Sequence, residues 1–165
     1  AARHDGPVYI RFGREDVPVV TDKDTPFTLG KGEVFAEGTD LSIIACGVMV
    51  YEALRAREGL AARGISARVV DLHTPKPLDR ALIERCARET GAIVTAEEHQ
   101  VNGGLGGAVS EVVVQTCPVP MELVAVHDRF GQSGKPAELM DAFGLRARDI
   151  VAAAERVMQR KRARI

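Results

Sequence analysis

The chain has 165 residues, of which 45% are apolar and 27% are charged. This composition suits a single domain of ordinary size with one hydrophobic core, and it excludes a disordered or fibrous protein and a second full domain. The 22 basic and 23 acidic side chains leave a formal net charge of -1, so no overall field attracts a polyanion and we expect no nucleic-acid partner.

Features that would indicate a membrane or an oxidising compartment are absent from the sequence. The longest apolar run, residues 41–50, is too short to span a bilayer, and no segment resembles a secretory signal. We therefore expect no membrane partner and a cytoplasmic location. Cys46, Cys86 and Cys117 form no CxxC pair and no zinc spacing, which predicts reduced, buried thiols. The chain begins with Ala1 rather than a methionine, so it could be a fragment of a longer protein.

The first element expected along the chain is a strand at residues 7–12 (PVYIRF), where β-branched and aromatic residues follow Gly6. Residues 13–32 are rich in Pro, Asp, Thr and Gly and show no sustained period, which predicts a connecting segment. Because a structureless connection of this length is unusual inside a compact domain, we place a boundary here and expect the strand to belong to a preceding domain.

Strands and helices alternate through the rest of the chain. Gly38-Thr39 predicts a hairpin of residues 33–37 with residues 40–46, and the second of these runs is apolar almost throughout, as in a parallel strand. Further strands are predicted at 66–72, 92–96 and 122–126, and helices at 48–63 with Gly64 closing it, 79–90 with Asp79 as N-cap and Gly91 at its end, 105–116, 136–143 and 148–162. This order predicts an α/β fold with a mainly parallel sheet of about five strands and helices on both faces, in three layers.

A basic run at residues 156–164 could be mistaken for a nucleic-acid or membrane patch. It ends the last predicted helix, where cations stabilise the negative pole of the helix dipole. Short basic runs are weak motifs, so we interpret this one as a helix end.

A glycine-rich turn, residues 102–107, lies between a predicted strand and a predicted helix, where backbone N–H groups could hold an anion. It lacks the spacing and the acidic partner of a dinucleotide-binding fold, and no Lys-Ser/Thr follows it as in a phosphate-binding loop. We therefore favour a packing role for Gly104 and Gly106, in which glycine allows a tight turn and a close approach of the helix to the sheet.

Polar residues follow several of the predicted strands. Glu97, Glu98 and His99 lie at the carboxyl end of a strand, where α/β sheets place ligands, and a carboxylate beside an imidazole can serve in acid-base chemistry or in a metal site. No second cluster of His or Cys completes a set of ligands, so we favour a partly exposed turn at a subunit interface. The same alternatives apply to His73 and His127.

Two arginines, Arg11 and Arg14, bracket Gly13 just after the first predicted strand. A guanidinium there could capture a phosphate or a carboxylate in a cleft. On spacing alone, solvated arginines paired with Glu15 or Asp16 are favoured.

Residues 128–139 (DRFGQSGKPAEL), followed by Phe143-Gly144-Leu145, resemble the DRFG-x-SGK-x-x-E…FG segment of transketolases. Residues 97–99 with the glycine turn and residues 108–110 resemble the turn and helix that precede that segment. Residues 7–20 resemble the close of the pyrimidine-binding domain. The resemblance covers nearly the whole chain.

The resemblance implies that residues 1–32 are the end of a pyrimidine-binding domain with its linker, and that residues 33–165 are the carboxy-terminal domain. The parent enzyme would be a homodimer that moves a two-carbon ketol unit between sugar phosphates in the pentose phosphate pathway, using thiamine diphosphate and Mg. The motif that holds the metal and the diphosphate is absent, and the activating glutamate would lie upstream. The chain would then be structural, inactive alone, and joined to the remaining domains or to an N-terminal subunit.

The resemblance also reverses the interpretation of Arg14, which occupies the place of an arginine that contacts the substrate phosphate in transketolases. The sequence reads Gly-Arg there rather than the Ser-Arg of the family. Arg11 stays a structural residue. For His99, Gly104 and Gly106, the family implies packing and dimer contacts, with no catalytic residue in this chain.

Other interpretations remain open at this point. The β subunit of 2-oxoacid dehydrogenases and deoxyxylulose-phosphate synthase share this type of domain, although the SGKPAEL and DRFG segments favour transketolase. The chain could also be a module that acts chiefly in assembly, or an independent small dinucleotide-binding protein with the glycine turn as its site.

Overall fold

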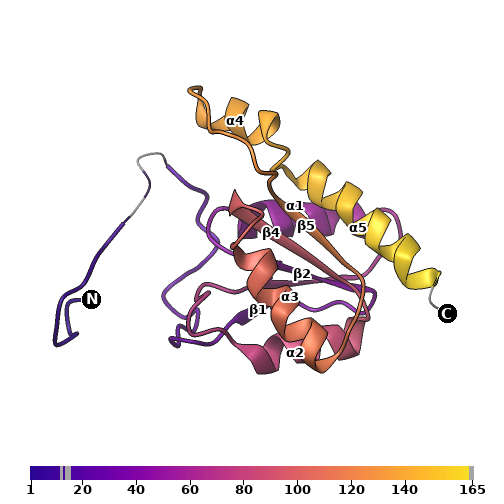
Figure 1. The fold of residues 1–165 in the computed structure, drawn as a ribbon, viewed down its shortest axis with the longest axis horizontal. Coiled ribbons are helices and arrows are strands. Elements are labelled where there is room, and N and C mark those ends of the chain that lie inside the picture. Colours follow the sequence, from indigo (N-terminus) through magenta and orange to yellow (C-terminus); the bar gives the residue numbers. More distant parts are fainter. Residues whose placement is uncertain (12, 14–15, 164–165) are drawn as a thin grey trace.

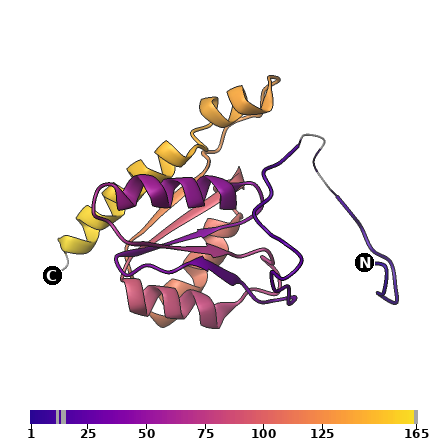
Figure 2. The same ribbon diagram turned by 180° about the vertical axis from the view of Figure 1, so that it is seen from behind.

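The computed structural model describes residues 1–11, 13 and 16–163. A central five-stranded sheet is covered by helices on both faces (Figures 1 and 2). The strands are β1 (Glu33–Ala36), β2 (Leu41–Ala45), β3 (Ala67–Asp71), β4 (Ile93–Gln100) and β5 (Met121–Val126), and the helices are α1 (Met49–Ala61), α2 (Arg80–Thr90), α3 (Leu105–Thr116), α4 (Pro136–Ala142) and α5 (Ala147–Arg162). The predicted α/β class with a three-layer arrangement is confirmed.

The strands lie in the order β1-β3-β2-β4-β5. All neighbours pair in parallel except β1, which runs antiparallel to β3 at one edge. Every residue of the central strand β2 is buried, as its continuous apolar sequence predicts for a strand covered on both faces. The carboxyl ends of four parallel strands therefore meet at one edge of the sheet, called the carboxyl edge below.

The predicted hairpin between residues 33–37 and 40–46 is wrong, because β3 lies between β1 and β2. The reason is a close backbone crossing at Gly38, where a β-carbon would lie only 2.1 Å from the carbonyl carbon of Ala67. Asp40 fixes this crossing, since its N–H donates to Ser66 O at 2.8 Å and its carboxylate accepts from Ser66 N at 2.7 Å. The Gly38-Thr39 segment thus passes over the start of β3 instead of folding back as a tight turn.

Two apolar clusters, one on each face of the sheet, form the core. Side chains alternate between the faces along a strand, so Ile43 packs under α1 and α5 while Ile44 packs under α2 and α3. Both isoleucines are fully buried.

The ends of α2 match the sequence signals. The side chain of Asp79 accepts from Leu82 N at 3.1 Å, and Gly91 ends the helix with a φ of 65°. The Asp79 carboxylate also accepts from Gly32 N at 3.2 Å, which holds the connecting segment to the domain. Helix α1, on the opposite face of the sheet, ends near Gly64, which has a φ of 72°.

The basic side chains of α5 contact the sheet and the loops around it. Arg156 and Arg160 both pair with Glu122, and Arg160 also donates to Met121 O at 2.7 Å on the edge strand β5. Lys161 donates to Asp40 O and Thr90 O at 2.8 Å each. The described part of the basic run is therefore the end of a helix that packs on the sheet. Arg164 lies outside the described residues.

The predicted strand at residues 7–12 is absent from the described part, residues 7–11, and Phe12 lies outside it. All described residues from 1 to 19 are exposed, and Tyr9 is 88% exposed. A strand needs a neighbour to satisfy its backbone, and the domain offers this segment none. Packing begins at Val20, which is partly buried against the α1–α5 cluster.

Among the helices of the described residues, none combines the length and the apolar character needed to cross a membrane.

Candidate functional site at the carboxyl edge of the sheet

A buried carboxylate occupies the N-terminus of α3. Glu97, on β4, is 2% exposed, and its two oxygens accept from Leu105 N at 2.6 Å and from Gly106 N at 2.8 Å. The free N–H groups and the positive end of a helix dipole are the features that make a helix N-terminus an anion site. Here the protein's own carboxylate takes the position that a bound anion would occupy.

The glycines of the turn let this carboxylate and the sheet approach the helix. A β-carbon on Gly104 would lie 2.2 Å from Glu97 Oε2. One on Gly106 would lie 2.4 Å from Leu123 Cδ2 and 2.9 Å from Thr95 Oγ1. In contrast, nothing lies within 4 Å of the position that a β-carbon on Gly107 would take. The two glycines singled out from the sequence therefore stand at close contacts, while their neighbour does not.

Sequence reasoning missed the separate role of Glu97, because it grouped this residue with Glu98 and His99 in one exposed turn. All three belong to β4, where Glu97 is buried and the following two residues are exposed. Strand alternation was the available signal, since Ile93, Thr95 and Glu97 share one face and Ile93 packs under α3. Nδ1 of His99 lies 3.0 Å from Gln100 O, and its ring faces solvent.

The ends of β2 and β3 place further polar groups at the carboxyl edge. Burial, together with the nearby charges of Glu97 and Asp71, raises the pKa of the Cys46 thiol to about 11. Burial also raises the pKa of Asp71, with a contribution from Glu33, while His73 acts in the opposite direction. Cys46 is thus a neutral thiol at physiological pH, which makes it a poor nucleophile.

Neither the cysteines nor the histidines assemble a metal site. All three cysteines are free thiols, Cys86 buried and the other two half-buried. His73 stacks on Phe27 of the connecting segment with ring centroids 4.6 Å apart, and His127 is exposed. Within residues 1–11, 13 and 16–163, no group of three or more His, Cys, Asp or Glu side chains could hold a metal ion.

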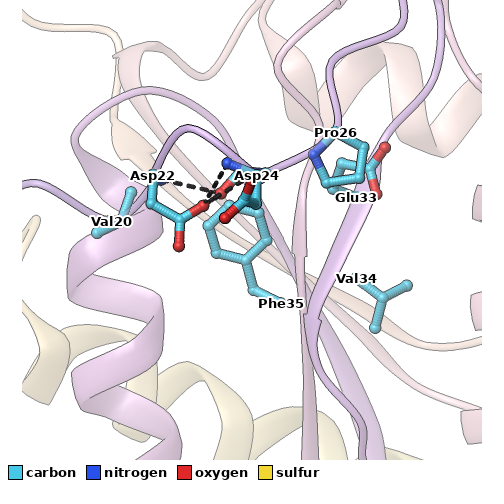
Figure 3. Close-up of a pocket in the computed structure, with 8 residues that line it drawn as sticks. Val20, Asp22, Asp24, Pro26, Glu33, Val34 and Phe35 are labelled. Atoms are coloured by element: carbon cyan, nitrogen blue, oxygen red, sulfur yellow. Dashed lines mark hydrogen bonds between the residues drawn. The ribbon is translucent and has the colours of Figure 1, made fainter.

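An open depression of about 410 Å³ lies between the connecting segment and β1 (Figure 3). Asp22, Asp24 and Glu33 contribute carboxylates to its lining, and Phe35 contributes an aromatic ring. Asp22 is committed to its own turn, because it accepts from Thr25 Oγ1, Thr25 N and Asp24 N at 2.9 Å each. These hydrogen bonds, that of the Thr25 hydroxyl first, lower the pKa of the Asp22 carboxyl. Asp22 therefore stabilises the turn that borders the depression, and the depression itself is wide open to solvent.

The DRFG segment leads out of β5 and projects from the sheet with α4 (Figure 1). Its direction is set at Asp128, which adopts a φ of 46°. Arg129 then turns inward: its backbone oxygen accepts from Gln100 Nε2 at 2.9 Å, its guanidinium lies 4.2 Å from the centre of the Phe143 ring, and it donates to Ala142 O. The adjacent Phe130 is 97% exposed.

The two arginines considered from the sequence cannot be compared in the structure. Arg14 lies outside the described residues. Arg11 is described and exposed.

The family model "Transketolase, C-terminal domain" matches residues 30–150. The chain belongs to this family. The resemblance to transketolases seen in residues 128–145 is thereby confirmed, and the described domain is a transketolase C-terminal domain.

Proteins similar over the whole chain agree with this assignment. A 6-deoxy-6-sulfo-D-fructose transketolase subunit from Clostridium sp. (strain MSTE9) is 48% identical over 161 residues, which cover 98% of this chain and 50% of that protein. A solved structure of a split-gene transketolase, in the form of an inactive beta4 tetramer, is 50% identical to this chain, with a TM-score of 0.91. The match covers 97% of this chain and 52% of that one. The chain thus spans about half the length of these relatives.

A 1-deoxy-D-xylulose-5-phosphate synthase from Geobacter sulfurreducens is also related, at 38% identity over 169 residues, which cover 99% of this chain and 26% of the synthase. The transketolase C-terminal domain is therefore shared between the two kinds of enzyme, as the sequence led us to expect.

We predict opposite effects on stability for two adjacent glycines of α3. Gly106→Ala should lower the free energy of unfolding by roughly 1–3 kcal/mol, because its methyl group overlaps Leu123 and Thr95. Gly107→Ala should raise it by about 0.5–1 kcal/mol, because alanine is the better helix former and has free space there. Urea unfolding of both variants and the parent chain measures the difference. Equal effects at the two positions would show that the turn does not require glycine for packing.

Proposed function

We propose that this chain supplies the C-terminal domain of a transketolase that transfers a two-carbon ketol unit between sugar phosphates with thiamine diphosphate and a divalent metal. The observation that carries the proposal is the match of nearly the whole chain to about half of a split-gene transketolase, at a TM-score of 0.91 and 50% identity. The transketolase subunit from Clostridium sp. is more similar to the chain than the deoxyxylulose-phosphate synthase is, at 48% against 38% identity.

The proposal includes a division of the chain at residue 32. Residues 1–32 would be the end of the pyrimidine-binding domain and its linker, and residues 33–165 the C-terminal domain. Two observations support this division: the family match begins at residue 30, and the described residues before Val20 are all exposed. Val17 and Val19, which are 56% and 88% exposed, would then be covered by the upstream domain.

The described residues do not fit thiamine diphosphate or its metal. The helix N-terminus best suited to a diphosphate already accepts the Glu97 carboxylate, and a second anion there would meet a like charge. The described residues also lack a cluster of metal ligands. We therefore assign cofactor binding and chemistry to the upstream domains, and a structural role to this chain.

The proposed role of this chain is assembly. Its partners would be the remaining transketolase domains, carried on the same polypeptide or on an N-terminal subunit, within a homodimer of the complete enzyme in the cytoplasm. A dinucleotide-binding module is the less favoured alternative, because Glu97 fills the turn that would have to hold the pyrophosphate.

We expect this chain alone to have no ketol-transfer activity and to acquire it when combined with a polypeptide carrying the diphosphate-binding and pyrimidine-binding domains. The activity is measured as turnover of sugar phosphates with thiamine diphosphate and Mg present. Each polypeptide assayed alone is the control. Full activity of the complementary polypeptide without this chain would contradict the assembly role.

Arg14 is the residue proposed to touch substrate, through charge-assisted hydrogen bonds from its guanidinium to the sugar phosphate. In the complete enzyme, Arg14→Ala should raise the KM for phosphorylated donors by an amount equivalent to about 1.5–3 kcal/mol. Donors without a phosphate should be nearly unaffected.

Arg11→Ala is the matched control for Arg14, because it removes the same charge three residues away and should leave both KM values unchanged. Equal losses for phosphorylated and unphosphorylated donors in Arg14→Ala would assign Arg14 to the solvated surface.

A further inference from the structure

The segment that projects from the carboxyl edge, residues 127–143, is called the arm here. Its residues 127–138 are all exposed, and α4, which forms its outer half, contains no buried residue. An arm that packs so little against its own domain contributes little to the core. Its sequence is nevertheless the segment that carries the resemblance to transketolases.

The arm is held in one position by contacts at its base. Gln100 Nε2 donates to the backbone oxygen of Arg129, and the Arg129 side chain reaches the Phe143 ring and Ala142 O. These contacts join the beginning of the arm to its end and tie both to β4. While the Arg129 side chain makes these contacts at the base of the arm, the neighbouring Phe130 side chain is left exposed.

Phe130 is thus an apolar ring presented to solvent by a preformed support. It is 97% exposed, the highest value among the exposed large apolar side chains of the described residues. An exposed aromatic side chain next to a residue that is fixed to the domain has the character of an interface anchor that fills an apolar pocket on a partner.

The upstream domains of the enzyme are the partner that fits this position. The stack of Phe27 on His73 and the hydrogen bond from Gly30 N to Thr74 Oγ1, at 3.1 Å, place the incoming segment at the end of β3. The arm leaves from the end of β5, which lies in the same carboxyl edge, and Figures 1 and 2 show both toward the same end of the sheet. If the half of the relatives' length that this chain does not span precedes it, as the proposed function holds, that half would join it beside the arm.

We infer that the arm docks onto the upstream half of the enzyme, with Phe130 inserted into an apolar pocket of that half. The inference rests on the proposed function, because it requires a complementary polypeptide. It adds the docking element and its anchor, which are distinct from the phosphate contact proposed for Arg14.

The test measures the dissociation constant between this chain and the polypeptide that carries the diphosphate-binding and pyrimidine-binding domains, by isothermal titration calorimetry. Phe130→Ala should raise the constant at least about tenfold, as expected for an interface anchor, and Phe130→Leu by less. Val114→Ala is the matched control: Val114 is 68% exposed, and it lies near the C-terminus of α3, away from the carboxyl edge. This control should leave the constant unchanged.

The outcomes separate the inference from the proposed function. Wild-type binding that Phe130→Ala does not weaken would overturn the inference and leave the proposed function intact, whereas absence of wild-type binding would overturn both. If Phe130→Ala instead dissolved a homo-oligomer of this chain in sedimentation velocity and left binding to the complementary polypeptide unchanged, the occupant would be a second copy and the inference would be wrong. The melting temperature should be the same for all variants, because each altered side chain is exposed.

Discussion

The contact between the Glu97 carboxylate and the N-terminus of α3 is the interaction on which the site at the carboxyl edge depends. A carboxylate that is 2% exposed is costly to bury unless hydrogen bonds and a favourable field compensate it. The N–H groups of Leu105 and Gly106 supply both, and the carboxylate in turn satisfies two donors that the helix leaves free. Gly104 and Gly106 leave room for this contact. The turn that resembles an anion-binding site is therefore filled by the protein's own carboxylate, which holds α3 to β4.

A similar contact between a buried glutamate and the start of a helix lies on the opposite face of the sheet. Glu52 of α1 is 6% exposed and accepts from Ala147 N at 2.7 Å, at the first residue of α5, with Arg146 beside it. A buried glutamate thus fixes the start of one helix on each face. Glu97 thus fills the anion position at the end of β4, and the exposed arm and the incoming segment are the surfaces that we propose for contact with partners.

Periodicity and local signals predicted most of the fold. The Asp79 cap, the helix at residues 105–116 and the apolar central strand depend on neighbours in sequence, and each was found where it was expected. The pairing of β1 was mispredicted because it is decided by the crossing of Gly38 over Ala67, which only the folded chain creates. The burial of Glu97 could have been predicted from strand alternation, but its contact with α3 could not, because its partners, eight and nine residues along the chain, meet it only in the folded turn.

The central claim is that Glu97 already occupies the anion position and that this domain therefore acts through assembly. Calorimetric titration of the chain with thiamine diphosphate and Mg, and separately with NAD, tests this claim most directly. The account predicts no saturable binding of either ligand in the micromolar range. A dissociation constant near 1 μM for either one, equivalent to about -8 kcal/mol of binding free energy, would contradict it.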